Sequence, residues 1–286
     1  MNILKRLIVQ TTILIFSLFS TLSLTAQVGW EVGPWLGVSY YLGDLNTNFD
    51  FSTPGIAGGL AARYNFNERL CMKFSGNYGK VMADDANSSN VYERLRNLSF
   101  ESVIVDGSAQ FEFNFLPYVH GSSEYFFTPY LFGGISVFYF NPKAELDGTY
   151  YELRELGTEG QFKGEEYYSV TGAVNYGLGL KLDLSYRWSL NFEIGARATF
   201  TDYLDDVSTV YPDKDDLMRM RDPIALELSD RSIIEPGLND GQLSEEGRQR
   251  GNSGNKDSYI FAGIGILYYF GDLKCPELSR PGGRRR

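Results

Sequence analysis

Between residues 170 and 200 the chain alternates apolar and polar side chains through two long runs, separated by a turn at 185–187. A period of two predicts β-strands, because successive side chains point to opposite faces of the pleat. Both runs exceed the roughly 9–11 residues with which a tilted strand crosses a bilayer. A soluble strand usually has about 5–6 residues. The pattern therefore predicts a hairpin of a membrane β-barrel.

The same alternation recurs along the rest of the chain. The expected strands cover residues 29–42, 55–66, 70–83, 98–116, 128–141, 170–184, 188–200 and 257–270. The links alternate between long ones (43–54, 84–97, 142–166 and 202–256) and short ones (67–69, 117–127 and 185–187). Outer-membrane barrels combine short periplasmic turns with long external loops. We predict an all-β, eight-stranded antiparallel transmembrane β-barrel over residues 27–271, with both termini in the periplasm.

The inward positions of these strands gather charge. An eight-stranded barrel has an interior that side chains just fill, and opposite charges there should pair because unpaired buried charge is costly. We therefore expect a solid, side-chain-filled lumen rather than a pore. The expected lumenal charges are Glu31, Arg63, Lys73, Asp106, Glu112, Lys181, Asp183, Glu193 and Arg197.

The fifth strand is the least clear, because both of its faces are apolar. We expect its outward, lipid-facing side chains to be Tyr130, Phe132, Phe138 and Phe140. The eighth strand carries apolar or aromatic residues at every second position up to a final aromatic. It resembles the terminal-strand signal of barrel assembly, here formed by Ile264, Ile266, Tyr268 and Phe270.

Two segments lie outside the expected barrel. Residues 1–26 have the features of a signal peptide, with Lys5 and Arg6 before an apolar run and a small-residue cleavage site ending at Ala26. Residues 272–286 would form a short, basic periplasmic tail beyond the last strand.

Composition supports a lipid-embedded barrel. The chain contains 20 Tyr and 20 Phe, and such side chains suit lipid-facing strands and interfacial girdles. The formal net charge of −10 argues against a nucleic-acid partner. The expected surroundings of the barrel are outer-membrane lipids.

Candidate chemistry is sparse. His120 is the single histidine, in a short link rich in Gly and Ser, so we expect a solvated turn rather than a catalytic base. One histidine and two distant cysteines do not make an ordinary zinc site. We expect no enzyme and no cofactor. Two acidic clusters lack the ligand spacing of an EF-hand, and we expect them to lie in solvated loops: Asp202, Asp205 and Asp206, and Asp213, Asp215 and Asp216.

The 202–256 loop is too long for a simple connector. Its apolar content exceeds that of an acidic disordered linker, and helical turns are expected at about 214–220 and 224–230, separated by Pro223. The loop either packs over the outer mouth of the barrel or presents an apolar ridge to a partner.

The two cysteines leave three alternatives. Cys71 begins the third strand at its periplasmic end, and Cys275 follows the eighth strand. They bond each other across the barrel mouth, or Cys275 bonds a periplasmic partner, or the thiols stay free.

Several strand ends and loop roots carry a family resemblance. They are residues 37–46, 96–100, 112–115, 127–132, 156–161 and 199–208. Together they resemble the PorG-type outer-membrane barrels of the Bacteroidetes type IX secretion system. The resemblance implies a structural role, in which the barrel anchors a periplasmic ring of PorK-type and PorN-type subunits. Under that reading, the partner contacts would be Lys274, Cys275, Arg284, Arg285 and Arg286. The alternative is a surface barrel whose long loops bind an external ligand or another outer-membrane protein.

Overall fold

The computed structural model describes residues 28–237, 239 and 241–271. The predicted signal peptide and the predicted tail lie outside these residues. Within the described ranges, no helix is both long enough and apolar enough to cross a membrane.

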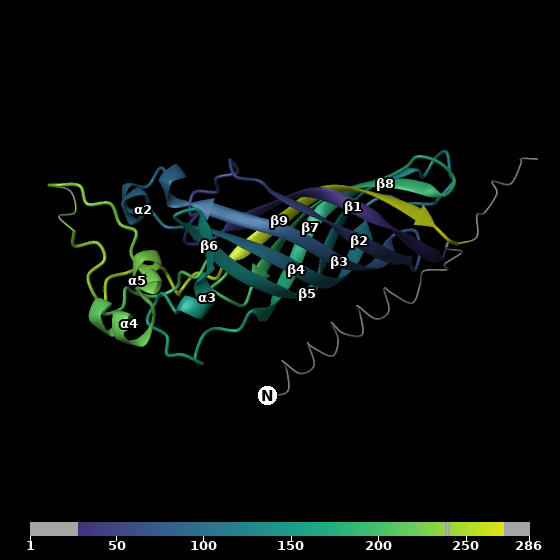
Figure 1. The fold of residues 1–286 in the computed structure, drawn as a ribbon. Helices are drawn as coiled ribbons and strands as arrows, with labels where there is room; N and C mark the ends of the chain where they lie inside the picture. Colours follow the sequence, from purple (N-terminus) through teal and green to yellow (C-terminus); the bar gives the residue numbers. More distant parts are fainter. Residues whose placement is uncertain (1–27, 238, 240, 272–286) are drawn as a thin grey trace, which may run out of the picture.

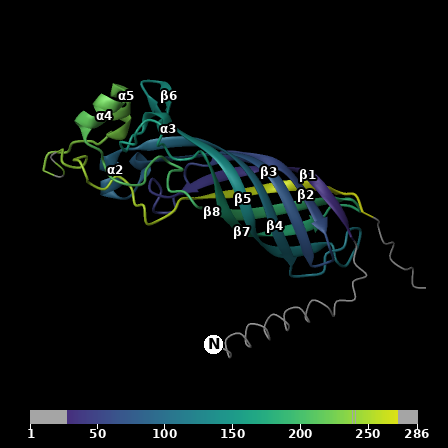
Figure 2. The same cartoon turned by 90° about the horizontal axis from the view of Figure 1, so that it is seen from below.

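Eight long antiparallel strands close into a barrel (Figures 1 and 2). β1 pairs with both β2 and β9, and β4 pairs with both β3 and β5, so the ring has no open edge. Closure satisfies the backbone polar groups internally, which lipid requires. The predicted eight-stranded antiparallel transmembrane barrel is confirmed. Its strands are β1 (Gly29–Leu42), β2 (Gly55–Asn65), β3 (Leu70–Asp84), β4 (Ser99–Asn114), β5 (Phe127–Leu146), β7 (Val170–Asp183), β8 (Trp188–Thr199) and β9 (Ser258–Tyr269).

A ninth, short strand extends one hairpin beyond the barrel. β6 (Thr149–Glu152) pairs with the last residues of β5 across a two-residue turn. Asp147 and Gly148 both have positive φ, 52° and 79°, as a type I′ hairpin turn requires. The predicted link at 142–166 therefore begins with the end of β5 and contains a short hairpin, for which the Asp-Gly pair is the local signal.

Most outward faces carry the apolar side chains that the alternation predicts. Leu36 is 72% exposed, Ile56 76% and Phe111 60%, as expected for side chains that face lipid. For β5 the predicted face is wrong. Its outward residues are Leu131, Ile135, Val137 and Tyr139, whereas the buried ones are Tyr130, Phe132, Phe138 and Phe140.

The reason lies in the lumen, which has an apolar half. Phe138 and Phe140 pack there with Phe100, Ile104 and other apolar residues in one continuous core. A strand that faces lipid on one side and this core on the other is apolar on both faces, so alternation could not distinguish inward from outward.

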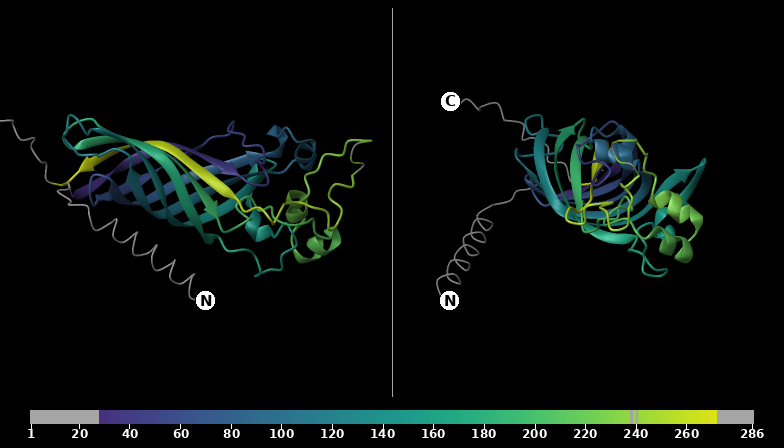
Figure 3. Two further views of the ribbon diagram at one scale, coloured as in Figure 1. Left: turned by 180° about the vertical axis from the view of Figure 1, so that it is seen from behind. Right: turned by 90° about the vertical axis from the view of Figure 1, so that its left-hand side faces the viewer.

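The long links gather at one end of the barrel (Figures 1 and 2). We call this part the cap: residues 43–54, 85–98, 147–169 and 200–257. It contains η1 (Asp85–Asn87), α2 (Val91–Arg96), α3 (Leu153–Leu156), α4 (Lys214–Met220) and α5 (Pro223–Ser229). The helical turns predicted near 214–220 and 224–230 are thus confirmed. Viewed toward this end, loops of the cap lie across the barrel mouth (Figure 3, right).

The opposite end, which we call the short-turn end, holds the three short links. The beginning of β1 and the end of β9 also lie there (Figure 1). The apolar core fills the lumen toward the cap, and the charged side chains described next fill it toward the short-turn end.

Candidate functional site

Glu112 of β4 lies at the centre of the lumenal charges. Its Oε2 is 2.7 Å from Nε of Arg63 and 2.7 Å from Nζ of Lys181. Its Oε1 is 3.8 Å from Nζ of Lys73. These side chains come from four different strands, and each is less than one tenth exposed. The cluster ties one side of the barrel to the other through its interior.

Two further carboxylates complete the pairing. Glu31 of β1 accepts a hydrogen bond from Nη1 of Arg63 at 3.0 Å and one from Nδ2 of Asn65 at 2.6 Å. Glu193 of β8 pairs with Lys73. Because each of these buried charges has an opposite charge in contact, the lumen avoids the high cost of an isolated ion.

All nine predicted lumenal charges have inward-facing, buried or largely buried side chains. They do not form one network. Asp106 accepts a hydrogen bond from the Tyr259 hydroxyl at 2.9 Å, and the Arg197 guanidinium lies 4.6 Å from the Phe261 ring centroid. A lumenal hollow of only about 30 Å³ is lined in part by Arg197, and it has room for about two water molecules.

His120 is not the solvated turn residue that we expected. Its side chain is 3% exposed, and Nε2 lies 3.1 Å from Oε1 of Glu31 while Nδ1 lies 3.0 Å from Oδ1 of Asp183. The imidazole also stacks on Tyr269 at 4.3 Å between ring centroids. Burial alone would lower the pKa of His120, but the neighbouring carboxylates outweigh it and raise the pKa to about 9. The link at 115–126 folds back so that His120 closes the short-turn mouth as a cation.

The acidic cluster in the 202–206 segment is likewise buried, against our expectation of a solvated loop. The Tyr41 hydroxyl donates to Asp205 at 2.6 Å, and a carboxyl oxygen of Asp257 lies 2.9 Å from the same hydroxyl. Burial raises the pKa of Asp205 well above its usual range, and the nearby charge of Asp257 adds to the effect. Burial also raises the pKa values of Asp202 and Asp206 to about 6. These acids belong to the packed base of the cap.

The second acidic cluster serves helix α4. Asp213 is its N-cap and accepts a hydrogen bond from the backbone N–H of Asp216, and Asp215 and Asp216 lie in the first turn. Acidic side chains there complement the helix dipole. Among the described residues, no group of three or more His, Cys, Asp or Glu side chains is arranged to hold a metal ion.

Two buried arginines that the sequence did not single out hold the cap together. Arg96 makes two hydrogen bonds of 2.8 Å to Asp85, and its Nη2 donates to the backbone oxygen of Asp44 at 2.7 Å. Arg250 lies 3.1 Å from Glu159. Nothing in the local sequence distinguishes these arginines from solvated loop residues, since their partners come from distant segments.

The assembly-signal residues of β9 lie on the barrel wall. Ile264, Ile266 and Phe270 are 50%, 45% and 62% exposed, and the Tyr268 ring packs edge to face on Phe270. This placement suits lipid contact, and a recognition role in assembly stays a prediction.

Cys71 faces the lumen and is fully buried, and it forms no disulfide with any residue from 28 to 271 that the structure describes. Its sulfur accepts a hydrogen bond from Nζ of Lys181 at 3.4 Å. The other predicted contact residues, Lys274, Cys275, Arg284, Arg285 and Arg286, lie outside the described residues, so the three disulfide alternatives stay open.

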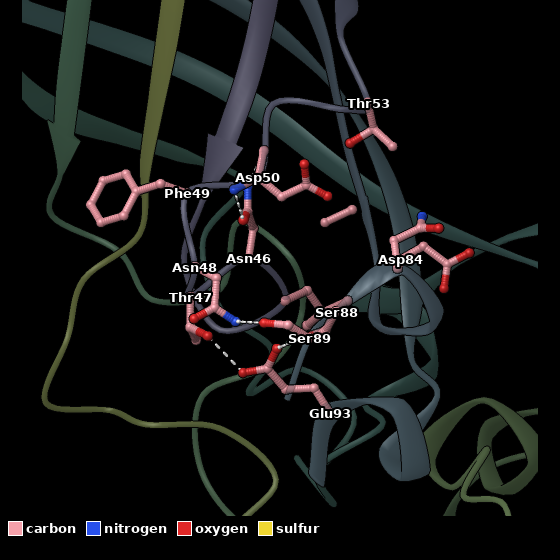
Figure 4. Close-up of a pocket in the computed structure, with 13 residues that line it drawn as sticks. Asn46, Thr47, Asn48, Phe49, Asp50, Thr53, Asp84, Ser88, Ser89 and Glu93 are labelled. Carbon is pink, nitrogen blue, oxygen red and sulfur yellow. Dashed lines mark hydrogen bonds between the residues drawn. The ribbon is translucent and has the colours of Figure 1, made fainter. Parts of the chain in front are cut away.

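The cap also contains a polar hollow of about 330 Å³ between the β1–β2 loop and the segment after β3 (Figure 4). Glu93 lies at its floor and is 4% exposed. Its carboxylate accepts hydrogen bonds from Thr47 at 2.7 Å and from Ser88 at 2.5 Å. The hollow is thus built by side chains that tie two loops together.

The family model described as "Domain of unknown function (DUF6089)" matches residues 9–230. No curated protein matches the chain. Among solved structures, Ail of Yersinia pestis aligns with a TM-score of 0.41 and 8% identity, over 85% of this chain and 99% of its own. OprG of Pseudomonas aeruginosa aligns with a TM-score of 0.41 and 8% identity, over 86% of this chain and 97% of its own. Neisserial surface protein A aligns with a TM-score of 0.40 and 10% identity, over 85% of this chain and 97% of its own. At these values the likeness carries no information about function.

Proposed function

Because the chain belongs to the DUF6089 family, whose description assigns no function, we propose one from its architecture: a non-enzymatic outer-membrane barrel that anchors the periplasmic ring of a type IX secretion machinery. The observation that carries the proposal is the filled lumen. Ion pairs fill one half and an apolar core fills the other, with a hollow of about 30 Å³ among the described residues. A lumen filled in this way argues against a passive pore, so we place the function of the barrel at its two ends.

In this proposal the short-turn end faces the periplasm and the cap faces outside. The sequence resemblance to PorG-type barrels supports ring subunits of PorK and PorN type as the periplasmic partners. The basic tail would reach them, with Lys274 and Arg284, Arg285 and Arg286 contacting acidic surface and Cys275 available for a disulfide. The compact turns at this end offer little other surface for a partner.

The test replaces residues 272–286 by a Gly-Ser segment of equal length, so that chain length and barrel are kept. We expect ring subunits to be lost from affinity purifications of the barrel and secretion to fail. The matched control replaces the loop tip at 236–247 by an equally long Gly-Ser segment, and ring association should persist. Tail replacement that leaves both ring association and secretion intact refutes anchoring through the tail.

Cys275→Ser tests the disulfide separately. If Cys275 bonds a partner, a reductant-sensitive band of higher mass on gels of whole envelopes disappears in this variant. The same mobility with and without reductant in the native chain excludes the partner bond.

A second candidate, a surface barrel that binds an external ligand, is favoured by one observation. The cap is not a set of open loops: buried arginines and acids organise it, and it contains a polar hollow. In this case the loop-tip replacement or changes in the hollow would abolish function, whereas replacement of the tail would not.

A further inference from the structure

The polar hollow continues into a second one. The first has a volume of about 330 Å³ and the second about 230 Å³, and the two share Thr53, Ala83, Asp84 and Asn87 in their linings. Together they form one groove on the side of the cap, from the β1–β2 loop to the β5–β6 hairpin. Its size falls within the usual range for small-molecule sites, roughly 300–1,000 Å³.

The walls of the groove are held in place before any ligand arrives. Thr47 and Ser88 donate to Glu93, and Nδ2 of Asn48 donates to the Ser89 hydroxyl at 3.1 Å (Figure 4). These bonds join the β1–β2 loop to the segment after β3. A preformed site of this kind loses little conformational entropy on binding.

The lining is polar and acidic. Carboxylates come from Asp50, Asp84, Glu93, Glu101 and Glu145, and neutral donors and acceptors come from Asn46, Thr47, Asn48, Thr53, Asn87, Ser88, Ser89 and Ser99. Among the described lining residues the one basic side chain is Lys143, and its Nζ is 2.8 Å from a carboxylate oxygen of Glu152. The groove therefore suits hydroxyl and ammonium donors and repels anions.

Three side chains extend this chemistry. Thr53 and Asn87 line both hollows and so lie where the two meet, and each side chain can donate and accept hydrogen bonds. Tyr150 of β6, 51% exposed, lines the far end of the groove and adds an aromatic side chain there. Hydroxyl-rich rings are recognised by this combination, in which side chains both donate and accept and an aromatic surface lies at one end.

We infer that the groove binds a short glycan whose sugars are uncharged or carry an amine. An extended peptide fits less well, because β3, β4 and the barrel part of β5 are paired on both edges, and β6, whose outer edge is unpaired, offers only four residues for strand addition. A metal ion is disfavoured because the described residues contain no suitable group of ligands. The glycan could be the sugar portion of a surrounding glycolipid or a free oligosaccharide, since the chemistry is the same.

This inference is independent of ring anchoring. It needs only the folded barrel and its cap, so loss of the anchoring proposal would not affect it. It would also supply the ligand class for the surface-barrel candidate.

The experiment uses the full barrel in micelles of an amine-oxide detergent, because sugar-based detergents would compete. Binding is followed by saturation-transfer NMR and titration calorimetry with trisaccharides of glucose, mannose, N-acetylglucosamine and glucosamine, and with sulfated maltotriose. We expect at least one neutral or amine-bearing trisaccharide to bind with a Kd of about 1 mM or tighter. The sulfated trisaccharide should bind at least tenfold more weakly.

Asn87→Trp fills the junction of the two hollows, and Gln242→Trp places the same bulk on an exposed cap position outside the groove. Both folded chains are verified by their shifted mobility on unheated gels. We expect Asn87→Trp to weaken binding at least tenfold and Gln242→Trp to leave it unchanged. Displacement of the trisaccharide by lipopolysaccharide micelles would identify a glycolipid as the source, and lack of displacement would identify a free glycan.

Three results would overturn the inference. They are the absence of binding by every neutral and amine-bearing trisaccharide, preference for the sulfated one, and equal binding by the two tryptophan variants. If an octalysine peptide binds and none of the sugars does, the ligand of the groove is a basic peptide and not a glycan.

Discussion

His120→Gln removes the cation that closes the short-turn mouth while keeping a polar side chain there. In the native barrel the imidazole lies within 3.1 Å of both Glu31 and Asp183 and is almost fully buried. Raising the pKa from about 6.5 to about 9 corresponds to roughly 3 kcal/mol of stabilisation by the charged form, as an upper bound. We expect the free energy of unfolding of the variant to be lower by up to this amount at neutral and acidic pH.

The pH dependence has a definite sign. The pKa of His120 is higher in the folded chain than in the unfolded chain, so its contribution is fully present below about pH 6.5. It is lost as the pH rises through about 9, where the folded chain releases the proton. The difference in unfolding free energy between native and variant chains should therefore be largest near pH 6 and should shrink by about pH 10.

The assay is urea unfolding in lipid vesicles, followed by tryptophan fluorescence and gel mobility from pH 6 to pH 10. Ser123→Gln, an exposed change in the same link, is the control and should match the native chain at every pH. A gap between native and His120→Gln chains that stays constant with pH would refute the ion-pair argument. A small constant gap would mean that the imidazole contributes by stacking on Tyr269 alone.

Three further changes test the interior and the cap. Glu112→Gln should lower the free energy of unfolding by about 3–5 kcal/mol in the same urea assay, because three buried cations lose their common negative charge. Phe138→Ala should cost about 3–5 kcal/mol by opening a cavity in the apolar core, whereas Val137→Ala on the outward face should cost far less. The native cap should resist protease best near pH 4 and lose resistance as the pH rises, since a carboxyl with a raised pKa in the fold contributes fully only below its unfolded pKa of about 3.9. Asp205→Asn keeps an acceptor for Tyr41 without the charge, so its digestion rate should depend less on pH, and an unchanged pH profile would contradict this reasoning.

Strand number and closure were predictable because they follow from a local signal. Each barrel strand satisfies the same two environments, lipid outside and packed lumen inside, and this imposes a period of two wherever the environments differ. Inward charges such as Glu112 and Lys181 were found on that basis. Their partners were not, since a contact between β4 and β7 through the lumen depends on shear and register rather than on either strand alone.

The errors arose where a local signal was absent or pointed the wrong way. The neighbours of His120 are glycine and serine, which usually mark a solvated turn, and only the return of the link into the mouth buries the imidazole. Asp205 lies in an acidic run that reads as solvent-exposed. It is buried because Tyr41, more than 160 positions away in the chain, supplies a hydrogen bond beneath the cap.

The division of the lumen determines how the cap behaves. Its apolar half is continuous with the cap: Leu153, Leu204 and Leu228 of the cap pack in the same buried cluster as Phe138 and other strand residues. Lifting the cap would expose this core to water, at about 25 cal/mol for each Å² of apolar surface. Opening a channel would therefore require two unfavourable steps. The apolar core under the cap would have to be exposed, and the ion pairs toward the short-turn end would have to be broken. The cap instead presents a fixed outer surface, and a fixed surface is what a preformed groove requires.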